Sequence, residues 1–128
     1  MRLDRLKAFV LALPHATIVK QWGENLVCKI GGKMFLIISL DGDTMEGCAF
    51  KCTPADYARL TGEVDGIIPA RYSMFKSHWV QLEDPDALTE ALLKEQVRLA
   101  YGLIKAKLPR KMQVALSVGG GGDRKSVV

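Results

Sequence analysis

Long apolar segments are absent from this chain of 128 residues. The longest nearly apolar run, Met34 to Leu40, is far shorter than the about 20 residues of a membrane-spanning helix, and the N-terminus carries no long apolar segment with a cleavage site. Cysteine is scarce as well, since only three are present, at irregular spacing. These absences exclude a transmembrane helix and a disulfide scaffold, so we expect a soluble protein in the cytoplasm.

Residues suited to metal binding or catalysis are few and poorly spaced. Cys48 and Cys52 are close in sequence, but neither Cys28 nor the two histidines join them in the pattern of zinc ligands. The three thiols are therefore expected to be reduced and mostly buried. Ser77 and His78 are adjacent in an expected strand, where their side chains point to opposite faces and cannot pair. We expect no metal, no cofactor and no enzymatic activity.

Charge is plentiful and unevenly distributed. The chain has 18 Lys and Arg against 14 Asp and Glu, which gives a net charge of +4. Residues 1–30 carry 5 basic and 2 acidic groups and residues 91–128 carry 8 and 2, whereas residues 31–90 carry 5 and 10. The total is compatible with a role in solubility alone. If the fold brings the two basic ends together, however, they form one positive surface.

Hydrophobic periodicity predicts a helix at each end of the domain. Leu3–Leu13 has apolar residues three and four apart, which indicates a short amphipathic helix that Pro14 ends. Asp86–Lys107 predicts a long helix whose broad apolar arc packs across a sheet. A short helical insertion begins after Thr53, with a proline at the first helical position, and ends by Gly62.

The intervening sequence has short apolar runs separated by turn residues, as antiparallel strands do. Gly31-Gly32 predicts a hairpin because glycine tolerates the positive φ angles of the tightest turns. The element order predicts an α+β two-layer sandwich, with the N- and C-terminal helices packed on one antiparallel sheet. The expected strands are Val19–Trp22, Leu26–Ile30, Lys33–Leu40, Cys48–Lys51, Ile67–Pro69 and His78–Leu82.

The C-terminal end has a different composition. The segment Gly119–Val128 begins with four successive glycines. It has no apolar periodicity and buries too little surface to order itself. We therefore expect one domain over residues 1–112 and a flexible glycine-rich tail over residues 113–128.

One edge of the long C-terminal helix carries Lys94, Arg98, Tyr101 and Lys105, which we call the helical stripe. Their offsets of 4, 7 and 11 place them along one line of the helix surface. The stripe is either a solvated face, softened by nearby glutamates, or a surface that contacts phosphates. The sequence leaves both interpretations open.

The densest group of candidate binding residues is the segment Ala70–Trp79. It contains two cations, three aromatic residues, a histidine and two hydroxyls. Lys and Arg neutralise phosphates while aromatic rings stack on bases, so this composition indicates a nucleic-acid surface. In the alternative interpretation Phe75 and Trp79 are core aromatics and the cations only solvate a loop.

These residues, together with other pieces of the chain, resemble the MmcQ/YjbR family of small bacterial proteins. The resemblance covers residues 3–112 and implies a frataxin-like, or CyaY-like, fold with a double-wing DNA-binding motif. Fold by itself does not settle function. The matching pieces are, in order, an N-terminal helix ending Leu13-Pro14, Gly32-Lys33-Met34-Phe35, Phe50-Lys51-Cys52-Thr53-Pro54, Ile68-Pro69-Ala70-Arg71-Tyr72, Lys76-Ser77-His78-Trp79-Val80, and Tyr101–Pro109.

The resulting hypothesis is a non-catalytic DNA-binding protein that applies basic and aromatic loop and hairpin residues to the phosphate backbone. The alternative is a small-anion or protein interaction module with no nucleic-acid role. Frataxin handles iron through an acidic first helix, but here Arg2, Arg5 and Lys7 outnumber Asp4, so we expect no iron site. The candidate binding residues are Lys33, Lys51, Arg71, Tyr72, Lys76, His78 and Trp79, with Lys94, Arg98 and Lys105 from the helical stripe.

Overall fold

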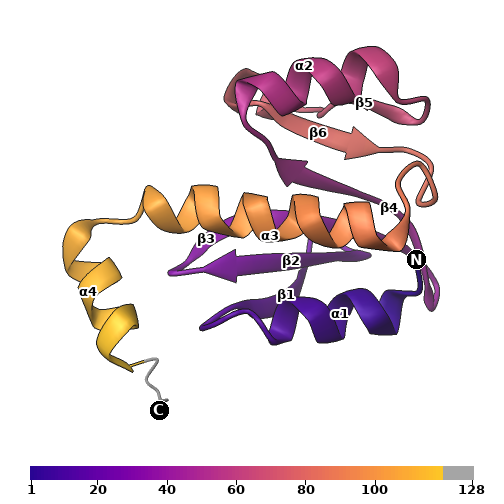
Figure 1. Cartoon of the computed structure of the whole chain (residues 1–128). Coiled ribbons are helices and arrows are strands. Elements are labelled where there is room, and N and C mark those ends of the chain that lie inside the picture. The colour runs from indigo at the N-terminus through magenta and orange to yellow at the C-terminus, as the bar shows by residue number, and fades with distance from the viewer. Residues whose placement is uncertain (120–128) are drawn as a thin grey trace.

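In the computed structural model, which describes residues 1–119, helices cover one face of a single six-stranded sheet (Figure 1). The elements are α1 (Leu3–Leu11), β1 (Thr17–Gln21), β2 (Asn25–Ile30), β3 (Lys33–Asp41), β4 (Thr44–Lys51), α2 (Pro54–Glu63), β5 (Ile67–Pro69), the 3-10 helix η1 (Met74–Ser77), β6 (Trp79–Leu82), α3 (Glu90–Ala106) and α4 (Arg110–Gly119). The strand order is β1-β2-β3-β4-β6-β5, and every neighbouring pair is antiparallel. The predicted α+β class is confirmed.

The β2–β3 hairpin forms where the sequence predicts it. Gly31 and Gly32 make its two-residue turn at φ +59° and +80°, values that residues with a Cβ rarely adopt. A register shift after Met34 leaves Phe35 without a partner across the hairpin, which is a β-bulge. Because of the bulge, the consecutive residues Phe35 and Leu36 both lie in the core under the helices. The bulge thus explains two successive buried residues on one face, while Met34 and Ile37 of the same strand pack on the other face.

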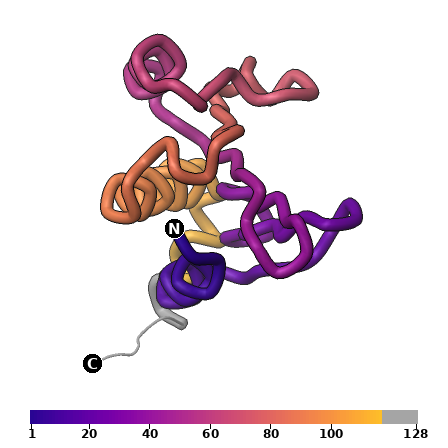
Figure 2. Tube along the Cα trace, turned by 90° about the vertical axis from the view of Figure 1, so that its right-hand side faces the viewer, coloured from indigo at the N-terminus to yellow at the C-terminus, as the bar shows by residue number. Residues whose placement is uncertain are grey.

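The main core lies between the sheet and the pair α1 and α3, which run side by side across it (Figures 1 and 2). Leu93, Val97 and Ala100 of α3 are fully buried there, as are Leu6 and Val10 of α1. The predicted packing of the N- and C-terminal helices on one sheet is therefore confirmed.

The long helix begins later than the sequence predicts. Thr89 is its cap, because the Thr89 hydroxyl accepts a hydrogen bond from the Leu92 N–H at 3.3 Å. The helix thus starts at Glu90 rather than Asp86. The predicted cap of α2, Thr53, is confirmed. No helix within residues 1–119 is long and apolar enough to cross a membrane.

Part of the predicted tail is helical. Residues 113–119 belong to α4, whereas residues 120–128 lie outside the part of the chain that the structure describes. Three apolar residues, spaced four apart, attach α4 and the turn before it to the rest of the domain: Leu108, Met112 and Leu116. Leu108 is buried, Leu116 packs against the main core, and a Cβ on Gly31 would lie 2.7 Å from side-chain atoms of Leu108 and Met112. This apolar spacing continues the domain past residue 112.

The strand predicted at His78–Leu82 is present, but it begins one residue later, at Trp79. Ser77 ends the 3-10 helix η1, and His78 adopts a left-handed conformation at φ +60° before β6 begins at Trp79. The argument from opposite strand faces therefore does not apply to Ser77 and His78. Tyr72 and Ser73 are also left-handed, at φ +59° and +69°, so left-handed residues flank η1 on both sides.

Candidate nucleic-acid interface

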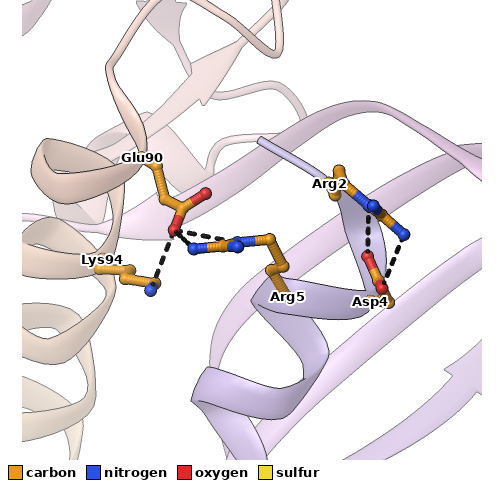
Figure 3. Close-up of polar contacts among 5 residues, drawn as sticks. All are labelled: Arg2, Asp4, Arg5, Glu90 and Lys94. Carbon is orange, nitrogen blue, oxygen red and sulfur yellow. Dashed lines mark hydrogen bonds and ion pairs between the residues drawn. The ribbon is translucent and has the colours of Figure 1, made fainter.

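The helical stripe is balanced by nearby acids rather than presented as free positive charge. Glu90 Oε2 lies 3.1 Å from the Lys94 ammonium and 2.5 Å from Nη2 of Arg5, which reaches across from α1 (Figure 3). The two cations hold the pKa of the Glu90 carboxyl below its usual range through these hydrogen bonds. The basic ends of the chain do meet in space, but an acid lies between them.

The other residues of the helical stripe are engaged within the chain as well. Nη2 of Arg98 lies 2.5 Å from Glu95 Oε2. Tyr101 is buried, and its hydroxyl donates a hydrogen bond to the Pro14 carbonyl at 2.6 Å. The Lys105 ammonium lies 5.8 Å from the centroid of the Tyr101 ring. Along this line two of the three cations are therefore paired with glutamates, Lys105 lies against a ring, and Tyr101 presents no exposed aromatic face.

The opposite face of the sheet, which we call the free face, is turned away from the helices. In Figure 2 the β1–β2 turn and the β5–β6 loop both project beyond the sheet on this side. A second, smaller apolar cluster forms here, centred on Ala49, Ala70 and Trp79, with Ile37 and Met74 packed against it. The free face is thus apolar in its middle and bordered by two projecting segments.

A hollow of about 680 Å³ opens on the free face, and we call it the free-face hollow. Asn25, Ser39 and Gln81 supply polar groups to it from β2, β3 and β6. Trp22 lines it from the β1–β2 turn, and Tyr72 from the β5–β6 loop. The complete lining is Trp22, Asn25, Ile37, Ser39, Cys48, Ala49, Ala70, Arg71, Tyr72, Met74 and Gln81.

Two aromatic residues are held outward at the edges of this hollow by unusual backbone. Trp22 is 63% exposed at φ +51°, and Tyr72 is 91% exposed at φ +59°. A left-handed conformation costs a residue with a bulky side chain about 1–2 kcal/mol. Such strain persists where the surrounding structure enforces it, and it is concentrated at functional sites.

Two of the predicted site residues, Arg71 and Lys76, are exposed on or beside the free face, and a third, Lys33, is exposed elsewhere. Arg71 lines the hollow next to Tyr72, and its Nη2 lies 3.3 Å from Glu83 Oε2. Both of these side chains are about half exposed, so the pair is weak. Lys76 is exposed on η1. Lys33 is exposed at the start of β3, directly opposite Ile30 of the main core, so it lies on the helix side of the sheet. Neither lysine has an acidic partner among residues 1–119.

The other predicted residues of the same segments are turned into the protein. Trp79 is 5% exposed in the second apolar cluster, so its ring has no free face for stacking. The His78 ring packs edge to face on Tyr57 of α2, with centroids 5.4 Å apart. The Lys51 ammonium is buried and donates to the Ser77 carbonyl. Burial, and then the nearby Lys107, lower the pKa of Lys51.

Sequence reasoning did not find four residues of the hollow: Trp22, Asn25, Ser39 and Gln81. Trp22 is the last residue of the predicted strand Val19–Trp22. The Gly-Glu-Asn that follows it marks a turn, however, and a large side chain beside a turn is solvent-exposed. Asn25 ends the same turn sequence, whereas Ser39 and Gln81 are single polar residues inside otherwise apolar strands. This alternation could have indicated them, because every second residue of a strand shares one face.

The cysteines have the character that the sequence predicts. Cys28, Cys48 and Cys52 are free and buried, and burial raises the pKa of each thiol to about 12. No group of three or more His, Cys, Asp or Glu side chains within residues 1–119 is arranged to hold a metal ion.

Comparison with known proteins places this arrangement in a family. Residues 11–103 match the model of the YjbR family. The chain belongs to the YjbR family. This YjbR-family protein is 27% identical over 119 residues to the uncharacterized protein YbdF of Escherichia coli O157:H7, a match that covers 91% of this chain and 94% of YbdF. The predicted family resemblance is thereby confirmed.

The fold of this YjbR-family protein is similar to a solved structure. The crystal structure of the Deinococcus radiodurans protein DR2400, which has a DUF419 domain, matches it with a TM-score of 0.73. The match covers 93% of this chain and 94% of DR2400, at 24% identity. At that identity the likeness establishes the fold alone.

Proposed function

We propose that this YjbR-family protein is a non-catalytic DNA-binding protein that contacts DNA with its free face. The observation that carries the proposal is the β5–β6 loop, where Arg71, Tyr72 and Lys76 are exposed beside the free-face hollow. Cations next to an exposed ring match the chemistry of a nucleic acid, which offers phosphates and flat bases. The β1–β2 turn and the β5–β6 loop would act as the two wings of the motif that the family resemblance implies.

The pairing of individual cations favours Lys76 beside the free face over Lys94 and Arg98 of the helical stripe. Arg5, Lys94 and Arg98 are each paired with a glutamate on the helical layer, so phosphates would have to displace those partners. Lys76, beside the free face, has no acidic partner among residues 1–119, so phosphates would meet it directly. The buried, free thiols fit a reducing compartment, and we include a cytoplasmic location in the proposal.

The proposal is tested by fluorescence anisotropy with labelled DNA, both single-stranded and duplex, at several salt concentrations. Affinity should fall steeply between about 50 mM and about 200 mM salt, because each phosphate contact releases counterions. Lys76→Ala should weaken binding and reduce the slope of log affinity against log salt by about one. Arg71→Ala should weaken binding as well.

The matched control is Arg98→Ala, which removes the same single charge from the helical layer and should leave affinity nearly unchanged. Undetectable binding to both forms of DNA at about 50 mM salt would contradict the proposal. Thermal stabilisation by a small anion, with none by DNA, would favour the small-anion alternative.

A further inference from the structure

We propose that the free-face hollow binds single-stranded DNA, whose unstacked bases lie on the rings of Trp22 and Tyr72. This inference rests on the proposed function and specifies which form of DNA the free face takes. A duplex stacks its base faces on one another and presents only base edges in its grooves. Exposed aromatic rings at a sheet surface find base faces to stack on only where a strand is single.

The shape of the hollow suits a short stretch of one strand. Its lining comes from β2, β3, β4 and β6, which are neighbours in the sheet. Four adjacent strands span about 14 Å, at about 4.8 Å between neighbours. Trp22 contributes from the β1–β2 turn and Tyr72 from the loop after β5, so the two rings belong to segments at the two edges of the sheet. The hollow therefore has room for more than one nucleotide between separate stacking positions.

The floor of the hollow matches the chemistry of a base. Ile37, Ala49 and Met74 give it an apolar surface on which a ring face can lie. The polar side chains of Asn25, Ser39 and Gln81 lie in the same hollow, where they can meet the hydrogen-bonding edge of a base. Gln81 is the distinctive one, because its side-chain amide makes no hydrogen bond within residues 1–119 and can serve both as donor and as acceptor.

The neighbouring Asn25 has a supporting role. Its side-chain amide donates to the Trp22 carbonyl at 2.9 Å, and its oxygen accepts from the Ser39 hydroxyl at 3.1 Å. These two bonds connect the β1–β2 turn to the middle of the sheet. They hold the left-handed Trp22 in place before any ligand arrives, which reduces the ordering that binding requires.

The residues at the two ends of the hollow are hard to explain by folding alone. Glycine adopts a left-handed backbone without a steric penalty, yet these positions carry Trp22 and Tyr72. Neither ring contributes much buried area, since 63% and 91% of these residues are exposed. Arg71 stands next to Tyr72, where it can meet the phosphate of a base stacked on that ring.

The experiment compares an oligothymidylate of about 12 nucleotides with a duplex of the same length, by anisotropy with the full chain. The wild type should bind the single strand more tightly. Trp22→Gly and Tyr72→Gly should each weaken single-strand binding about tenfold and change duplex binding little, because each removes one stacking ring. Both variants should fold, since glycine suits the backbone at each position, and urea unfolding checks this. Trp22→Phe should restore most of the affinity.

Phe75→Ala is the matched control. Phe75 is an exposed aromatic residue of the same loop that does not line the hollow, so its removal should leave single-strand binding unchanged. Tighter binding to the duplex, or single-strand binding unchanged in both glycine variants, overturns this inference while the proposed function stands. If neither form of DNA binds the wild type, both proposals fail.

Discussion

The guanidinium of Arg5 on α1 lies 2.5 Å from the carboxylate of Glu90, the first residue of α3, although 85 positions separate them in sequence. This contact joins the two basic ends of the chain and at the same time neutralises part of their charge. A charge pattern that looks like one positive surface in the sequence is therefore partly cancelled in the fold. The pair also gives the first prediction.

Glu90→Gln should lower the melting temperature slightly at pH 7 and low salt, because Arg5 and Lys94 lose their shared partner. The pKa of Glu90 is lowered in the folded protein, so its contribution is present above the pKa of the unfolded carboxyl. That contribution is lost as the pH falls through the lower, folded value. Thermal unfolding of wild type and variant should differ at pH 7, and the difference should shrink as the pH falls below the usual carboxyl range and as salt is added. A difference that changes with neither pH nor salt would contradict the ion pair.

Tyr101→Phe should destabilise the fold by about 1 kcal/mol, because the Pro14 carbonyl loses the hydroxyl that donates to it at 2.6 Å. Urea unfolding should show a lower midpoint with an unchanged slope. Tyr57→Phe is the control, since the Tyr57 hydroxyl makes no hydrogen bond within residues 1–119 and its removal should leave the midpoint in place. Equal effects of the two changes would refute the assigned bond.

Gly31→Ala should be more destabilising than Gly32→Ala. Both glycines are left-handed, so an alanine at either position carries the backbone penalty. At position 31 the new Cβ would also lie 2.7 Å from Leu108 and Met112, whereas position 32 has no atom within 4 Å. The difference between the two free energies of unfolding should be about 1 kcal/mol, the low end for overpacking, because the atoms to be displaced are the ends of flexible side chains. Indistinguishable values would mean that α4 does not pack on the hairpin.

The three thiols should be unreactive in the folded protein. Burial raises the pKa of Cys28, Cys48 and Cys52 to about 12, so the thiolate that attacks a disulfide reagent is nearly absent at pH 8. Titration with an aromatic disulfide should release little product from native protein and three equivalents after denaturation. Rapid reaction of one thiol in the native state would show that its surroundings open.

Local chemistry decided the parts of the fold that the sequence predicted well. Gly31-Gly32 specifies its turn through φ alone, and Thr53 before a proline specifies a helix start. The side of α3 that is buried could not be predicted as precisely from the sequence. Leu92 and Leu99 belong to the same broad apolar arc as the core residues, yet they are 55% and 36% exposed. Hydrophobic periodicity predicts the apolar arc of α3, but the position of the sheet determines which part of that arc is buried.

The candidate site also contains residues that the sequence predicts and residues that only the fold brings together. Composition identified Arg71 and Tyr72, because they stand together in one loop. It could not pair them with Trp22 or Gln81, which reach the hollow from other segments through the strand order. Composition also could not separate the buried Trp79 from exposed aromatics, since burial depends on which face of β6 meets the second cluster.

The positions of the two tryptophans give the protein separate optical reporters. Trp22 is 63% exposed at the hollow, whereas Trp79 is 5% exposed beneath the β5–β6 loop. The emission of a water-exposed indole lies to the red of that of a buried one, so the two signals are separable. Quenching of the red component would report occupancy of the hollow, and a shift of the blue component would report loss of the fold, in one sample without any label.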